Sequence, residues 1–335
     1  MKKLLALLLV VALGCSLVAC GGSDSGSGDS GKGGSEDKTY KVAIVTNAPI
    51  DDGGWNAGCY ADMCKAAEEN GFETAYTENV AEADYVATFT EYANLGFDLV
   101  IAPGNEFTDA IEAVAPKFPD TNFVIQNGGV CGDNYISVKC DNTMMGFIAG
   151  CMAGLKTKTN HVAIIGGTEI TTGWQAVDGF EQGVKAVNPD CEALHQFSNS
   201  WDDAALGKEI GISMITTNDV DVFFGVASAV DAGVREGCAQ YDDRYAIAQP
   251  ADYLDQNPDV ILTSILIDNA ALISIAMQDT KNGTFGNKVV EGGIKEGVLS
   301  LGNFGDAAEE VKEEFMSYYD KIADGSLTFD YNIEQ

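Results

Sequence analysis

The chain has 335 residues, 46% of them hydrophobic, which suits one large or two medium domains with substantial apolar cores. It carries 51 acidic and 19 basic side chains, for a formal net charge of -32 at pH 7. Because phosphate groups are repelled by such a surface, the charge excludes nucleic acid as a partner and disfavours an electrostatic grip on anionic lipid.

The first twenty residues have the pattern of an export signal. Met1 is followed by two lysines, an apolar run from 4 to 13 and the sequence LVAC, which ends at Cys20. A run this short does not span a bilayer, so residues 1–19 are expected to be a signal peptide. LVAC resembles the bacterial lipobox, whose cysteine is diacylated, and two acyl chains anchor a protein stably. We therefore expect an extracytoplasmic protein, held at the outer face of the cytoplasmic membrane by a lipid on Cys20. The alternatives are an ordinary signal peptide cut after Ala19 and lipidation of Cys15.

Residues 20–38 are expected to contain the lipidated cysteine and a flexible linker. The stretch from 21 to 37, GGSDSGSGDSGKGGSED, has no apolar side chain large enough to anchor a core. A Gly/Ser coil of this length has a mean reach on the order of 20–25 Å. A globular body could therefore move above a membrane without leaving it.

From residue 39 onward, strand and helix patterns alternate in two series. Short apolar runs predict strands, and the amphipathic stretches between them predict helices. Strands are expected at 41–46, 72–76, 98–103, 122–126 and 135–138, and again at 161–165, 192–197, 220–226, 245–248 and 260–264. Helices are expected at 56–70, 82–95, 107–117 and 144–155, and then at 174–187, 204–216, 229–240 and 269–281.

This alternation is typical of α/β folds whose parallel sheets are covered by helices on both faces. Two series predict two Rossmann-like lobes with a ligand cleft between them. A faint repeat supports the division. KVAIVTNAPIDDGGWNAGCYADMCKAAEENG opens the first series and HVAIIGGTEITTGWQAVDGFEQGVKAVNPD the second, with Trp55 and Trp174 at equivalent points.

The three tryptophans, Trp55, Trp174 and Trp201, each follow a predicted strand. Ligands of open α/β sheets bind at the carboxyl ends of strands, and an aromatic face there favours a flat or ring-shaped ligand. Burial in a core is the alternative for each tryptophan. Polar residues near predicted strand ends are further candidates, although such residues are also common caps and turn formers: Asp52, Asn56, Asn105, Asn127, Asp202 and Asp252.

The chemistry of an enzyme or a metal site is not indicated. Seven cysteines follow Cys20, none in a C-x-x-C pair, and the chain has two histidines, so neither a metal nor a cofactor is expected. Most cysteines are expected to be small buried hydrophobes, although Cys131 and Cys140 are close enough along the chain to suggest a disulfide. No histidine is patterned with a nucleophile, and neither a G-x-G-x-x-G loop nor a P-loop is present.

Six stretches, in order along the chain, resemble one protein family. They are IDDGGWNAG, DLVIAPGNEFTDAIEAVAPKFPDTNFVIQN, GFIAGCMAGLKTKTNHVAIIGG, DGFEQGVKAVNP, DVFFGVASAVDAGV and NPDVILTS. From about residue 41 to 301 the chain is similar to the basic membrane lipoprotein, or purine nucleoside receptor, family of ABC-transporter substrate-binding proteins. The resemblance implies the type I periplasmic binding protein architecture, with three hinge crossings. It also implies two lobes that close on a ligand and deliver it to a membrane permease.

The aromatic binding residues of that family have counterparts here. Its acidic, aromatic and asparagine first loop matches Asp52, Trp55 and Asn56. Its second-lobe stacking residue matches Trp201, with Trp174 as a substitute. The resemblance therefore implies that the aromatic residues that stack on the ligand are retained.

The polar binding residues of the family differ. Its base-reading aspartate falls on Asn127, Asp252 is a shifted counterpart of another aspartate, and a lysine falls on Ile267. A carboxylate accepts a pair of hydrogen bonds from purine N–H groups, whereas an amide donates one and accepts one. The expected ligand is therefore a nucleoside, a free base or a related cyclic solute.

Two other functions fit the same fold: a ligand-sensing receptor that feeds a signalling protein, and a sugar receptor, because tryptophan also stacks on sugar faces.

The first lobe is expected at 39–156 plus about 265–284, and the second at 157–264 plus about 297–335. Hinge crossings are expected near 155–160, near 263–266 and after Phe285, in a monomer.

Overall fold

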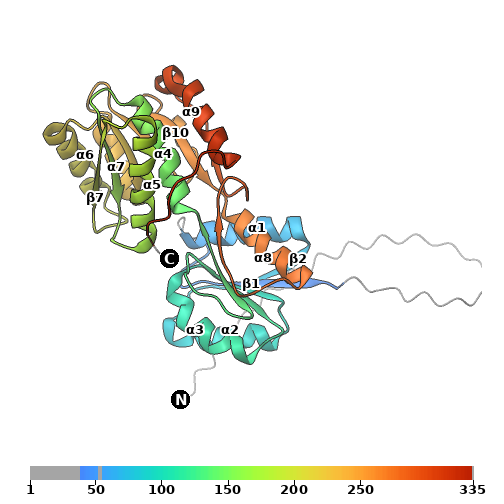
Figure 1. Cartoon of the computed structure of the whole chain (residues 1–335). Helices are drawn as coiled ribbons and strands as arrows, with labels where there is room; N and C mark the ends of the chain where they lie inside the picture. The colour runs from blue at the N-terminus through green and yellow to red at the C-terminus, as the bar shows by residue number, and fades with distance from the viewer. Residues whose placement is uncertain (1–37, 52–54, 334–335) are drawn as a thin grey trace, which may run out of the picture.

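The computed structural model describes residues 38–51 and 55–333. Two β-sheets with helices packed on both faces form two lobes, joined by a few chain segments (Figure 1). The predicted α/β class with two lobes is confirmed. The signal peptide, Cys20, the linker to residue 37 and Asp52 all lie outside the described residues.

The first sheet has the strand order β11-β5-β4-β3-β1-β2, and its neighbouring strands are parallel. Inner strands such as LVIA in β3 are continuous apolar runs, because helices bury both faces of the sheet. The bounds are β1 Tyr40–Val45, β2 Phe72–Thr77, β3 Leu99–Ala102, β4 Asn122–Gln126, β5 Tyr135–Cys140 and β11 Val289–Gly292.

The second sheet has the order β12-β10-β9-β8-β6-β7. Its neighbouring strands are parallel except at the edge, where β12 runs antiparallel to β10. The bounds are β6 His161–Gly166, β7 Glu192–Phe197, β8 Val222–Val226, β9 Tyr245–Ala248, β10 Ile261–Ile267 and β12 Leu299–Leu301.

Helices cover both faces of each sheet (Figure 1). On the first sheet, α1 (Trp55–Asn70) and α8 (Asn269–Asn282) pack on one face, and α2 (Tyr85–Asn94) and α3 (Thr108–Val114) form a separate core on the other. On the second, α4 (Asn142–Lys156), α5 (Thr171–Val187) and α9 (Glu309–Ala323) lie opposite α6 (Ala204–Asn218) and α7 (Ala229–Cys238). None of the helices in the described part of the chain has the length and apolarity needed to cross a bilayer.

Helices α4 and α5 pack with their backbones in contact, because glycines recur every four residues on both. A side-chain carbon at Gly150 would lie 2.8 Å from the Val184 nitrogen and closer still to the Phe180 carbonyl oxygen. A carbon at Gly183 would lie 3.0 Å from the Cys151 nitrogen. Only glycine permits this approach. Helix α4 therefore belongs to the second lobe, whereas the expected boundary at residue 156 placed it in the first.

Within the described residues, three segments cross between the sheets. The first is Asp141, whose carboxylate caps α4 by accepting the Met144 N–H at 2.8 Å, and whose own N–H donates to the Gly292 carbonyl at 2.9 Å. The second is Asp268, between β10 and α8, and the third is 293–298, between β11 and β12. The second and third lie near the expected positions. The first precedes α4 instead of following it, because α4 packs on α5.

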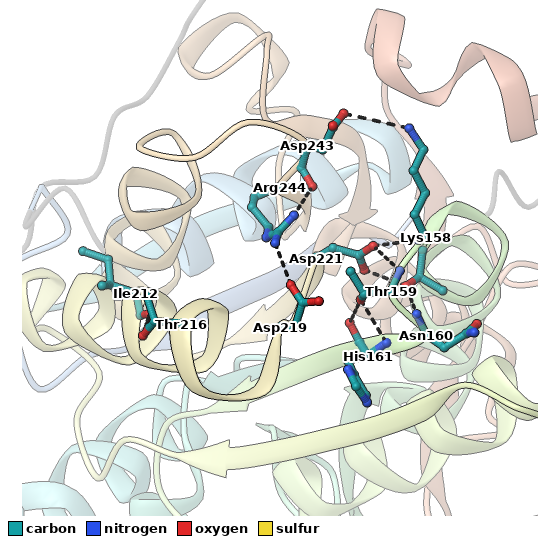
Figure 2. A network of polar contacts seen from close by, with 11 residues as sticks. Lys158, Thr159, Asn160, His161, Ile212, Thr216, Asp219, Asp221, Asp243 and Arg244 are labelled. Atoms are coloured by element: carbon teal, nitrogen blue, oxygen red, sulfur yellow. Dashed lines mark hydrogen bonds and ion pairs between the residues drawn. The ribbon is translucent and has the colours of Figure 1, made fainter.

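A network of hydrogen bonds and ion pairs lies at the amino ends of the strands of the second sheet (Figure 2). The buried carboxylate of Asp221 accepts hydrogen bonds from the Thr157 hydroxyl and the Lys158 N–H, both at 2.6 Å, and from the Thr159 N–H at 3.0 Å. Nearby, the Arg244 guanidinium donates to Asp219 at 2.8 Å. The network fixes the turn between α4 and β6, at the opposite end of the sheet from the loops that follow its strands.

The cysteine pair suggested by the sequence does not form a disulfide. Cys131 and Cys140 are both free thiols. Cys131 lies beside the start of β5 and Cys140 is the last residue of that strand, so most of a strand separates them, roughly 13–17 Å. A disulfide needs Cα atoms within about 7 Å.

Candidate functional site

Trp55 is the first residue of α1 and lies beyond the carboxyl end of β1. Its indole N–H donates to the carbonyl of Pro103, which follows the neighbouring strand β3. The side chain is still 43% exposed. The hydrogen bond therefore holds an accessible ring across the ends of two adjacent strands, where it can offer a face to a flat ligand.

Asn127 follows β4 and lies at the same edge of the first sheet. The pairing of Ala102 with Ile125 places Asn127 level with Gly104 on the adjacent strand. Its backbone has a left-handed φ of 55°, and its N–H donates to the Val138 carbonyl at 2.8 Å. The residue is exposed, so its amide is available at the sheet edge.

A carboxylate that the sequence did not single out lies between these two residues. Glu106 folds back over Gly104, where a side-chain carbon would lie 2.5 Å from the Glu106 Cδ and 2.7 Å from its Oε1. The Nδ2 of Asn47 donates to Oε1 of Glu106 at 2.9 Å. The pairing of Ile44 with Ile101 places Asn47, too, level with Gly104. The available signal was a glycine directly after a predicted strand, with a glutamate two residues later.

Three other first-lobe candidates are placed differently. Asn56 is only 8% exposed, so its side chain enters the interior beneath α1. Asn105 is exposed, and its Oδ1 accepts the Thr108 hydroxyl at 3.1 Å, which is a helix-start contact. Asp52 lies outside the described residues.

Trp201 occupies the carboxyl edge of the second sheet, after β7. Its ring lies against Gly167, which follows β6, and a side-chain carbon there would lie 2.6 Å from two atoms of the ring. Its carbonyl accepts the Ala229 N–H at 2.9 Å. The indole is 41% exposed. The close contact with Gly167 and the backbone hydrogen bond therefore fix a second accessible ring at a strand-end edge.

Trp174 packs against β7 near the carboxyl end of that strand and is less exposed than Trp201. It lies in the first turn of α5 and is half-buried. Its ring centroid is 5.3 Å from that of His195 and 4.8 Å from that of Phe197, both on β7. These contacts fit a packing role between a helix and a sheet.

Asp252, after β9, has its carboxylate occupied by the protein itself. It accepts the Asn303 N–H at 2.9 Å, the Asn303 Nδ2 at 2.7 Å and the Leu254 N–H at 3.1 Å. The Asn303 backbone hydrogen bond is the main reason that the pKa of Asp252 is lowered. The side chain thus ties the loop after β9 to the segment after β12.

Asp202, beside Trp201, is exposed and accepts the Ser200 hydroxyl at 3.1 Å.

The sequence also did not single out a buried acidic residue, Asp231, or a buried basic residue, Arg235, which lie under the carboxyl end of β8. Both oxygens of Asp231 accept the Ala227 N–H at 3.0 Å, and burial raises the pKa of Asp231 to about 7. Arg235, one turn further along α7, is 6% exposed, and its Nε has no hydrogen-bond partner in the described structure. Both line a cavity of about 10 Å³, which is room for about one water molecule.

Most of the chain matches a known protein family. A family model described as ABC transporter substrate-binding protein PnrA-like matches residues 39–328. The ABC transporter nucleoside-binding protein BmpA of Lactococcus lactis is 28% identical, over 98% of this chain and 99% of its own length.

Solved structures support the same fold. A solute-binding protein of an ABC transporter system from Aeropyrum pernix K1 has a TM-score of 0.69 at 20% identity, covering 88% of this chain and 94% of its own. A transcriptional activator of the comK gene from Bacillus halodurans has a TM-score of 0.74 at 23% identity, covering 87% and 100%. At these identities the likeness shows the fold alone, and it confirms the predicted periplasmic binding protein architecture. With the family match over most of its length, the chain belongs to the PnrA-like substrate-binding proteins of ABC transporters.

Proposed function

We propose that this protein captures a nucleoside-like small molecule between its two lobes and delivers it to the permease of an ABC importer. The observation that carries the proposal is the pair of exposed indoles at the strand-end edges, Trp55 on the first sheet and Trp201 on the second. One ring on each lobe allows a flat ligand to be stacked from both sides when the lobes close.

Polar groups at the edge of the first sheet would orient the stacked ring. Asn127 presents an amide there, level with Gly104, which directly follows the Pro103 carbonyl that holds Trp55. Stacking and hydrogen bonding need no covalent step, so the proposed role is capture and release without catalysis. The nucleoside named for the Lactococcus relative is consistent with this ligand class.

The proposed location is the outer face of the cytoplasmic membrane. The sequence of residues 1–20 supports export and a lipid on Cys20, and the Gly/Ser-rich stretch that follows supports a tether. A tethered monomer would keep the captured ligand within reach of the permease.

A second candidate is ligand sensing, in which occupancy is passed to a signalling protein. The observation that favours it is the sequence likeness to the transcriptional activator protein med of Bacillus subtilis, which is 27% identical over 82% of this chain and 85% of its own length. Neighbouring genes for an ATPase and a permease would support transport, whereas a neighbouring sensor kinase would support sensing. Loss of radiolabelled ligand uptake on deletion of the gene would decide for transport.

The ligand class is tested by titrating the protein, produced from residue 21 onward, with nucleosides, free bases and sugars in a calorimeter. We expect at least one nucleoside or base to bind with a Kd of about 1 μM or tighter, which corresponds to about -8 kcal/mol. Binding of a sugar alone, or of none of these solutes, would contradict the proposal. Mass spectrometry of molecules released from the purified protein would then identify the ligand.

A further inference from the structure

The middle of the first sheet's carboxyl edge carries a carboxylate flanked by two amides. Gly104 lies beyond β3, and the strand registers place Asn47 and Asn127 level with it on the two neighbouring strands. The Glu106 carboxylate lies directly over Gly104. Since the carbonyl of Pro103 holds the Trp55 indole, the carboxylate is next to the proposed stacking surface.

The Glu106 carboxylate is held in place by a hydrogen bond, but part of its capacity to accept hydrogen bonds remains open. Its Oε1 accepts one hydrogen bond, from Asn47 at 2.9 Å, and its Oε2 accepts none from the residues that the structure describes. Glu106 is exposed. An ionised carboxylate offers about four acceptor positions, so capacity for two further N–H donors remains. Gly104 is required for this pose, because a side chain there would occupy the space of the carboxylate.

We infer that Glu106 reads the base edge of the ligand by accepting two parallel N–H donors, such as the N1–H and 2-amino group of a guanine ring stacked on Trp55. The inference rests on the proposed nucleoside function. Two parallel N–H···O bonds to a carboxylate are charge-assisted and favoured over neutral pairs. An adenine edge offers one donor and one acceptor, so its lone pair would face the carboxylate and be rejected.

Asn127 does not supply this readout. Its amide donates one hydrogen bond and accepts one, whereas a guanine edge requires two acceptors side by side. Asn47 is a positioning residue, because its amide is already engaged with Glu106. Glu106 is thus the carboxylate of the described sheet edge that is both placed and available for a pair of donors.

The test is calorimetric titration of the mature chain with guanosine, inosine and adenosine, in three forms: unaltered, Glu106→Gln and Glu91→Gln. Glu91 is an exposed residue of α2 and provides a control with the same change of charge. We expect the unaltered protein to bind guanosine most tightly and adenosine least. Glu106→Gln should weaken guanosine binding about 10- to 100-fold and strengthen adenosine binding, because a glutamine presents one donor and one acceptor. Glu91→Gln should match the unaltered protein.

Two failures can be told apart. If nucleosides bind but Glu106→Gln leaves the ratio of guanosine to adenosine affinity unchanged, the inference is overturned and the proposed function stands. A preference of the unaltered protein for adenosine would overturn it equally. If none of the three nucleosides binds the unaltered protein, the inference is overturned, and the proposed function is overturned with it only when no other nucleoside and no free base binds either. Matching melting temperatures of the three forms would show that any change in affinity is not a folding defect.

Discussion

Replacing Gly150 by alanine tests the contact that fixes α4 against α5. The new side-chain carbon would lie 2.8 Å from the Val184 nitrogen, 3.0 Å from the Phe180 carbonyl carbon and closer still to the Phe180 oxygen. These are backbone atoms of a helix and cannot rotate away. Because carbon atoms need about 3.5–4.0 Å, the two helices would have to separate by roughly 1 Å.

The size of the effect follows from two opposing terms. Overpacking of this kind costs about 1–3 kcal/mol, and alanine recovers up to about 1 kcal/mol in helix propensity. Gly58 of α1 is the matched control, since a side-chain carbon there would meet nothing within 4 Å. Gly58→Ala should therefore gain up to about 1 kcal/mol. We expect the two variants to differ by about 1–3 kcal/mol in unfolding free energy, with Gly150→Ala the less stable.

Thermal unfolding followed by circular dichroism measures this difference. For a lobe of this size, each kcal/mol moves the melting temperature by about 2–4 °C. Gly150→Ala should melt below the unaltered protein and Gly58→Ala at or above it. A Gly150→Ala protein that melts with the Gly58→Ala variant would refute the close packing of α4 on α5, and with it the position of the first crossing.

The remaining predictions concern the buried acid and the lipid anchor. The pKa of Asp231 is raised to about 7 in the folded protein from an ordinary 3.8, so the folded state binds the proton of this carboxyl group more tightly than the unfolded state does. The contribution of Asp231 to stability therefore falls as pH rises from about 4 to about 7. In urea unfolding, Asp231→Asn should gain stability relative to the unaltered protein between pH 5 and pH 7.5, and parallel pH profiles would contradict this. For the anchor, metabolic labelling with palmitate should mark the membrane fraction of the unaltered protein but not of Cys20→Ser; label retained by that variant would move the lipid to another residue.

Much of the fold could be predicted because its strands are continuous apolar runs buried on both faces, such as VAIV in β1 and LVIA in β3. The strands β11 and β12 escaped prediction, since VVEG and LSL are too short to give a pattern. Helix α4 was assigned to the wrong lobe because it directly follows the fifth strand. The glycines at 146, 150 and 154 indicate close packing, but sequence spacing does not identify the partner helix.

The site was predictable where residue type and strand end coincide. Trp55 and Trp201 lie at strand-end edges because each follows its strand through a loop. Trp174 differs because α5 begins three residues before it, which turns the ring toward β7. Glu106 was missed because its place over Gly104 depends on the short 3-10 turn at Asn105–Phe107, which composition does not reveal.

The most direct test of the proposed capture mechanism is calorimetric titration of the Trp55→Ala and Trp201→Ala proteins with the tightest-binding nucleoside. The matched control is Trp174→Ala, which removes an indole packed on His195 and Phe197. We expect each strand-end substitution to weaken binding by about 1–3 kcal/mol, or about 5- to 150-fold, because the ligand loses one stacking face. Trp174→Ala should lower the melting temperature but leave the affinity unchanged. Full-strength binding by both strand-end variants would contradict the account.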